Sequence, residues 1–240
     1  MLLKILLLAS VALSFLFVPW FLKAVRPGRS RKSLLLKTVC STLFLVSAAL
    51  ASGIAGNRSL FATLILWGLA LGWAGDFLLH VSQKQLCLLA GLLSFLGGHV
   101  FYIAAYSKAI ATVAPGASFF DPAETAAFLV LFAAVLVFAL ARRKQFAKAF
   151  VPVVLYAAML LLMFVKASSL GMRLAMSNTQ NGGLVCLILL LGVMLFVVSD
   201  ALLAVKVFFG KEDSHKLMTL NIITYYAAQQ LLACTILFVY

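Results

Sequence analysis

Two acidic residues of this 240-residue chain stand inside long apolar stretches. Asp76 lies in "WAGDFLLH" and Asp200 in "VVSDALLA". A carboxylate at the centre of a membrane-spanning helix costs about 2.5 to 3.5 kcal/mol on insertion scales, so such residues usually face the interior of a helix bundle and serve a function. We therefore take these two carboxyl groups as the candidate catalytic residues.

The other four of the six acidic residues have local explanations. Asp121 begins "DPAE", which offers an N-cap Asp, a Pro at the first helical position and Glu124 at N3. This pattern predicts a capping box that opens a helix. Glu212 and Asp213 lie beside lysines in a short polar segment, where solvation explains them.

The composition indicates an integral membrane protein. The chain is 65% hydrophobic and 10% charged, with a mean hydropathy of +1.15. Because the apolar runs are long and do not alternate, they predict helices of about 20 residues rather than barrel strands. The fold class is therefore all-α, an eight-span transmembrane helical bundle, with spans near 3–22, 34–55, 60–80, 85–107, 123–141, 147–166, 183–205 and 216–239.

The basic residues predict the orientation of the bundle. With eight spans, 14 of the 19 Lys and Arg residues fall on one side, and the positive-inside rule makes that side cytosolic. Both termini are then lumenal. The net charge of +13 is explained by topology and by attraction of the basic loops to anionic lipid, so no nucleic-acid partner is expected.

The two aspartates are predicted to lie at a similar depth. Asp76 precedes Lys84 by eight residues and Asp200 precedes Lys206 by six, which corresponds to about 12 Å and 9 Å of helical rise from the basic rim. The similar segments "GDFLL" and "SDALL" indicate two parallel halves, 1–110 and 120–240, within the single membrane domain 1–240.

Other residues could surround the two carboxyl groups. Residues spaced by four from Asp76 form a stripe along one face of its span. The two glycines of "GLALG" are on that face and permit another helix to approach closely. A second stripe lies in "NIITYYAAQQLLA", and "FLGGHVFY" places a His and a Tyr on one helical face, deeper than the aspartates. The residues expected to orient substrate or water are His99, Tyr102, Asn221, Tyr225 and Gln229, and those expected to support the site are Gly72, His80 and Ser199.

Other roles for the two aspartates compete with a catalytic role. Each Asp could hold helices together by hydrogen bonding or pair with a snorkelling Lys. A metal site from Asp76, His80 and His99 is conceivable, but the chain lacks an HExxH or comparable doublet, so we expect no metal and no other cofactor. The four cysteines, all within apolar runs, indicate neither disulfides nor zinc.

The ordered set "GDFLL", "GGHVFY", "VVSDALLA" and "YYAAQQLLA" resembles the YhhN-like family of eight-span lysoplasmalogenases over essentially the whole chain. The length is similar to that of the larger of two vertebrate paralogues. The resemblance implies hydrolysis of the vinyl ether bond of lysoplasmalogens, giving a fatty aldehyde and a glycerophospho head group in the endoplasmic reticulum membrane. It also implies that the acidic residues of the family fall on Asp76 and Asp200.

Vinyl ether hydrolysis needs a proton donor and a stabilised oxocarbenium ion. Glycoside hydrolases meet the same need with two carboxyl groups, one protonated and one ionised. A buried pair can share one proton at neutral pH, although the sequence leaves open which Asp holds it. The rival hypothesis is a proton-coupled carrier that uses the same carboxylates, and a third is a lipid-binding scaffold without activity. The sequence leaves head-group preference and oligomeric state open.

Overall fold

The computed structural model describes residues 1–26, 28–56, 59–82, 84–177, 181–211 and 214–239, except for the side chain of Lys148. Within these ranges eight helices are long and apolar enough to cross a membrane, which confirms the all-α eight-span bundle. They are α1 (Leu2–Val25), α2 (Arg31–Ala55), α3 (Leu60–Val81), α4 (Gln85–Val113), α5 (Pro122–Ala141), α7 (Phe150–Met176), α8 (Gly182–Phe208) and α9 (His215–Cys234), which a short 3-10 turn (Thr235–Leu237) prolongs.

Two helices, α4 and α7, extend furthest beyond the spans predicted from the sequence. A short helix α6 (Arg143–Phe146) and a 3-10 turn (Ala147–Ala149) precede α7, which continues past Lys166 to Met176. Likewise, α4 continues past Lys108 to Val113. The sequence boundaries stopped at the first lysine, but Lys166 is only 1% exposed because a buried glutamate compensates its charge inside the bundle.

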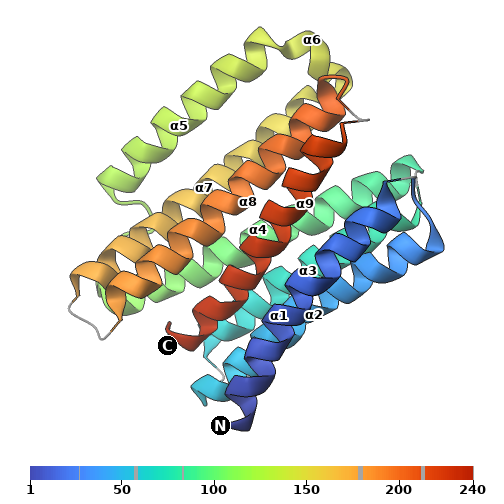
Figure 1. Ribbon diagram of the computed structural model, residues 1–240. Helices are drawn as coiled ribbons and strands as arrows, with labels where there is room; N and C mark the ends of the chain where they lie inside the picture. The colour runs from blue at the N-terminus through green and yellow to red at the C-terminus, as the bar shows by residue number, and fades with distance from the viewer. Residues whose placement is uncertain (27, 57–58, 83, 178–180, 212–213, 240) are drawn as a thin grey trace.

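The helices run up and down, so both termini lie at one end of the bundle (Figure 1). We call the opposite end, where α1 and α8 end and α9 begins, the basic end. Its helix ends and connections carry Arg26, Arg29, Arg142, Lys144 and Lys206. Helix α9 packs against α8, α2, α1 and α3, whereas α5 packs mainly on α7 and lies at the outside of the bundle (Figure 1).

Glycines on α3 permit the close approach that the "GLALG" stripe predicts. A Cβ atom on Gly68 would stand 2.4 Å from the ring of Tyr102, and one on Gly72 would stand 2.8 Å from Nε2 of Gln229. Only glycine leaves room for these side chains against the helix backbone. The stripe therefore seats α3 against both α4 and α9.

The cap of α5 differs in one respect from the predicted capping box. The Asp121 carboxylate accepts a hydrogen bond from the Glu124 backbone N–H at 2.8 Å, and Pro122 occupies the first turn, as expected. The Glu124 side chain, however, does not return to the N-cap backbone: it pairs with Lys166 at 2.5 Å. The prediction was wrong in this half, because a buried lysine on α7 offers the carboxylate a stronger partner than a backbone amide.

Candidate active site

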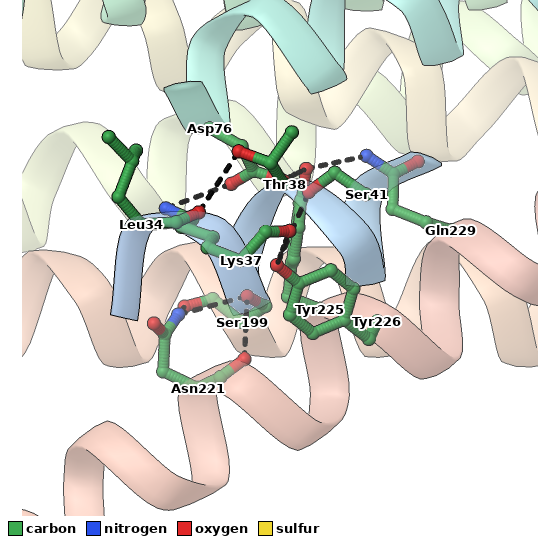
Figure 2. Close-up of polar contacts among 10 residues, drawn as sticks. All are labelled: Leu34, Lys37, Thr38, Ser41, Asp76, Ser199, Asn221, Tyr225, Tyr226 and Gln229. Carbon is green, nitrogen blue, oxygen red and sulfur yellow. Dashed lines mark hydrogen bonds and ion pairs between the residues drawn. The ribbon is translucent and has the colours of Figure 1, made fainter. Parts of the chain in front are cut away.

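Asp76 is the centre of a buried polar network on α3. Its side chain is held from two other helices, by Lys37 and Ser41 of α2 and by Tyr225 of α9 (Figure 2). Lys37 Nζ lies 3.0 Å from Oδ1, while the hydroxyls of Ser41 and Tyr225 donate to Oδ2 at 2.6 and 2.9 Å. Asp76 is 3% exposed, so this carboxylate is bound almost entirely by protein donors.

A relay of side chains fixes the direction of the Tyr225 hydroxyl. Tyr102 of α4 donates to Oε1 of Gln229 at 3.1 Å, and Nε2 of Gln229 donates to the Tyr225 oxygen at 3.0 Å. Because that oxygen already accepts a hydrogen bond, its own proton is directed to Asp76. The residues predicted from "NIITYYAAQQLLA" and "FLGGHVFY" thus meet around Asp76, with the exceptions of Asn221 and His99.

The surroundings of Asp76 match an ionised carboxylate. One cation and two hydroxyl donors compensate a full negative charge and use both oxygens as acceptors. Removing the cation would leave a buried charge uncompensated, which is costly in a low-dielectric interior. The lysine pairing that competed with the catalytic reading is therefore present at Asp76, although the lysine comes from another helix.

Asp200 on α8 has different surroundings. Its Oδ2 accepts a hydrogen bond from the hydroxyl of Tyr156, on α7, at 2.8 Å. Among the described residues, neither a Lys nor an Arg lies within salt-bridge distance of this carboxyl group. A single neutral donor suits a protonated carboxyl far better than an isolated anion in the membrane interior.

His99 lies beside Tyr156 rather than in the Asp76 network. Its ring stands edge-on to Tyr156 at 5.1 Å and to Phe196 at 5.2 Å between centroids. His99 is 1% exposed, and neither ring nitrogen forms a hydrogen bond with the part of the chain that is described, although the Phe95 carbonyl lies one turn before it. A buried imidazole in this state can serve water or a polar ligand.

Ser199 and Asn221 join α8 to α9 next to Asp200. The Asn221 side-chain amide donates to the Ser199 carbonyl at 2.7 Å and to its hydroxyl at 2.9 Å, and Ser199 Oγ donates to the Asn221 carbonyl at 3.2 Å (Figure 2). These bonds place Ser199 level with Asn221, and Tyr225 follows Asn221 by one turn, about 6 Å of rise. The two aspartates therefore lie within about one helical turn of the same depth.

The two carboxyl groups are connected through four successive side chains, Tyr225, Phe196, His99 and Tyr156, rather than by a direct contact. Tyr225 contacts Phe196 at 6.0 Å between ring centroids, and Phe196 contacts His99, which contacts Tyr156. No hydrogen bond or ion pair of the described residues joins Asp76 to Asp200. A water-filled cavity that both would share stays a prediction.

His80 does not extend the Asp76 network, although the two residues lie one turn apart on α3. Its Nε2 lies 2.8 Å from the Ser33 hydroxyl, and its ring packs edge-on against Phe21. Across the described ranges, no three His, Cys, Asp or Glu side chains gather as metal ligands, so Asp76, His80 and His99 do not form the conceivable metal site.

Sequence reasoning missed four residues of this region: Lys37, Ser41, Tyr156 and Tyr226. Lys37 and Ser41 are one turn apart on α2, so counting by fours would have found a polar stripe there. Tyr226 lies 3.3 Å from the Ser41 hydroxyl, oxygen to oxygen. Tyr156 stands alone in "VVLYAAMLLL", and nothing in its local pattern separates it from an ordinary aromatic residue of a spanning helix.

The chain was compared with known proteins. The model of the YhhN family matches residues 33–236, which include every candidate residue above. The search of curated proteins and the search of solved structures returned no match.

Proposed function

The chain belongs to the YhhN family, the family of the lysoplasmalogenases, and from this membership we propose that it hydrolyses the vinyl ether bond of lysoplasmalogens. The substrates are alkenyl-glycerophosphoethanolamine or -choline, and the products are a fatty aldehyde and the glycerophospho head group. We place the protein in the endoplasmic reticulum membrane with its basic end in the cytosol and both termini in the lumen.

The observation that carries the proposal is the unequal environment of the two carboxyl groups, of which Asp76 is buried and Asp200 is partly buried. Asp76 is compensated by Lys37 and two hydroxyls, whereas Asp200 has the neutral Tyr156 hydroxyl. Glycoside hydrolases catalyse hydrolysis through an oxocarbenium ion with one carboxylic acid and one carboxylate, and vinyl ether hydrolysis passes through the same kind of ion. We therefore assign Asp200 as the acid and Asp76 as the base.

The reaction balances with these two groups and one water. Asp200 gives its proton to the alkene carbon that bears the alkyl chain, and the ether carbon becomes an oxocarbenium ion. Water adds to that carbon while Asp76 takes the proton that the water loses, forming a hemiacetal. The hemiacetal then collapses: its hydroxyl proton returns to Asp200, the glycerol oxygen takes the proton from Asp76, and the aldehyde leaves.

The surrounding side chains have separate tasks in this scheme. Tyr225, oriented by Gln229 and Tyr102, holds the Asp76 carboxylate in place. Tyr156 holds Asp200. The ring nitrogens of His99 beside it have no hydrogen-bond partner in the described part of the chain, so they are available to a water or a glycerol hydroxyl. Such preorganised donors act strongly because the site is shielded from solvent.

A carrier that uses the same carboxylates is the rival function. Many carriers bind ions where a spanning helix is interrupted. Here α3 and α8 run as continuous helices through Asp76 and Asp200. The continuous helices favour the enzyme over the carrier.

The test is aldehyde release by the purified protein in detergent, where no gradient exists. A lysoplasmalogen should yield aldehyde, and the lysophospholipid with an ester in place of the vinyl ether should not. Binding of lysoplasmalogen without any aldehyde would overturn the proposal in favour of a lipid-binding scaffold. Lysolipid uptake into vesicles without hydrolysis would favour the carrier.

A further inference from the structure

A cavity of about 490 Å³ opens at the basic end, between the last turn of α1, the last turns of α8 and the start of α9. Its volume falls in the range of about 300 to 1,000 Å³ that is usual for small-molecule sites. Arg26 and Arg29 line it from the connection after α1, and Lys206 lines it from α8. Val25 and Met218 add apolar surface.

The chemistry of the lining is that of an anion site. Arg26 and Arg29 carry a permanent charge and can bind phosphate oxygens in a bidentate manner, while Lys206 adds a compact point charge. Among the described residues that line the cavity, none is acidic.

The start of α9 adds to the positive potential of the cavity. Ser214 caps this helix by accepting a hydrogen bond from the Leu217 N–H at 3.3 Å, and both Ser214 and His215 line the cavity. The first N–H groups of a helix lack partners within it, and its dipole favours an anion at that end.

Along α8 and α9, the cavity lies closer to the basic end than the layer that holds the two aspartates. Lys206 follows Asp200 by six residues on α8, and Met218 precedes Tyr225 by seven on α9, so about 9 to 10 Å of helical rise separates the cavity from the aspartate layer. In a lysoplasmalogen only a glycerol unit separates the phosphate from the vinyl ether. A phosphate held in the cavity would leave the ether directed toward Asp200, with the alkenyl chain deeper in the membrane.

We propose that this cavity binds the phosphodiester of the lysolipid substrate, with Arg26, Arg29 and Lys206 as its ligands. The inference rests on the proposed function and adds to it a head-group site. It predicts that the enzyme prefers phosphorylated alkenyl lipids, and that this preference comes from charge at the basic end rather than from contacts near the carboxyl groups.

The decisive measurement compares two substrates that share the vinyl ether: a lysoplasmalogen and the 1-alkenylglycerol that lacks the phosphate. The ratio of their kcat/KM values should fall about tenfold in the double variant R26A/R29A, through a higher KM for the lysoplasmalogen. The matched control is R142A/K144A, which removes the same charge from another part of the basic end and should keep the ratio within about twofold. Equal ratios in both double variants would overturn the inference.

Two further arms separate the possible sources of an effect. The assay is repeated in nanodiscs of neutral lipid and in nanodiscs that also contain phosphatidylserine. A fall in the kcat/KM ratio that is confined to the anionic discs would mean that the arginines respond only to membrane charge. That result would overturn the head-group site. Arg29 donates to the Ser82 carbonyl at 3.4 Å, so R26A alone is also measured and should shift the ratio in the same direction without lowering the melting temperature.

A direct binding measurement distinguishes a failure of the head-group site from a failure of the hydrolase function. Isothermal titration of the detergent-solubilised protein with glycerophosphoethanolamine should show binding that R26A/R29A weakens about tenfold and that R142A/K144A keeps, with inorganic phosphate as a weaker competitor. Binding of this kind without aldehyde release would support the head-group site while the hydrolase function fails. Aldehyde release with unchanged binding in R26A/R29A would support the hydrolase function while the head-group site fails.

Discussion

Two buried carboxylate–lysine pairs lie in different parts of the bundle, and they differ in the side chains that surround them. Lys37 pairs with Asp76 near the basic end, at 3.0 Å, and Lys166 pairs with Glu124 near the other end, at 2.5 Å. Both carboxylates are buried, at 3% and 5% exposure. Burial and ion pairing alone therefore do not distinguish catalysis from architecture.

The further partners of the two pairs differ. Lys166 also donates to the Phe119 carbonyl and stands 4.3 Å from the centre of the Phe119 ring, while Arg173 of α7 pairs with the N-cap Asp121. All these bonds fasten the start of α5 to α7. Asp76 instead accepts two hydroxyl protons from two helices, and a second carboxyl group lies within about one turn of its depth.

The largest expected difference between the pairs is in activity. Asp76→Asn and Asp200→Asn should each lower aldehyde release at least a thousandfold, about 4 kcal/mol in the barrier, because the amide can neither take nor give the proton. Glu124→Gln, which removes the same charge from the other pair, should stay within about threefold of the wild type in well-folded protein. Initial rates of aldehyde formation measure all three.

Comparable losses in all three variants would mean that the two pairs do not differ, and would remove the catalytic assignment. A melting curve for each variant guards against misfolding. Asp200→Asn is the cleanest of the set, because its amide oxygen can still accept the hydrogen bond from Tyr156.

The second difference is in stability, and it runs the opposite way. Lys166→Met should destabilise the protein by about 3 kcal/mol, because it leaves Glu124 buried without its cation. Lys37→Met should cost less, since the Lys37 side chain is 16% exposed against 1% for Lys166 and lies closer to water. Unfolding in denaturing detergent gives both values, and the double variant E124Q/K166M should recover most of the loss. An equal cost at both lysines would contradict the distinction.

The sequence was sufficient for the fold and for half of the network. Length, hydropathy and spacing predicted eight helices. Counting by fours placed Tyr225 and Gln229 on one face of the last span, and that face was expected to surround the carboxyl groups. Lys37 lies within the predicted span 34–55, but its pairing with Asp76 depends on how α2 packs on α3, which a single sequence does not reveal. Lys166 was missed for the same reason: whether a lysine ends a span or is buried within it depends on a partner from another helix.

A third comparison concerns two glycines, one packed against the Asp76 network and one facing open space. Gly72→Ala places a Cβ atom 2.8 Å from Nε2 of Gln229, so the amide must move and release the Tyr225 hydroxyl. We expect about a tenfold loss in kcat, near 1.4 kcal/mol, with KM little changed. Gly183→Ala on α8, where the new Cβ atom meets nothing within 4 Å, is the matched control and should keep full activity. Unchanged kcat in Gly72→Ala would show that the relay does not orient Asp76.

The smallest effect belongs to the cap of α5, outside the membrane span. The Glu124 backbone N–H, together with Arg173, holds the pKa of the Asp121 carboxyl below its ordinary value of 3.8. A lowered pKa stabilises the folded state above the ordinary value, and this contribution is lost as the pH falls through the folded value. Asp121→Asn keeps an N-cap oxygen but loses the charge, so it should cost under about 1 kcal/mol at pH 7.

That cost should shrink in acid, where the wild-type carboxyl is also protonated. Melting temperatures of the wild type and Asp121→Asn, measured from pH 7 down to below the ordinary pKa of 3.8, should converge at the acid end, and aldehyde release at neutral pH should be unchanged. A pH-independent gap would show that the side chain matters through packing rather than charge. A loss of activity would instead show that the start of α5 is coupled to the site around Asp76. That result would contradict the separate roles that we assign to the two lysine pairs.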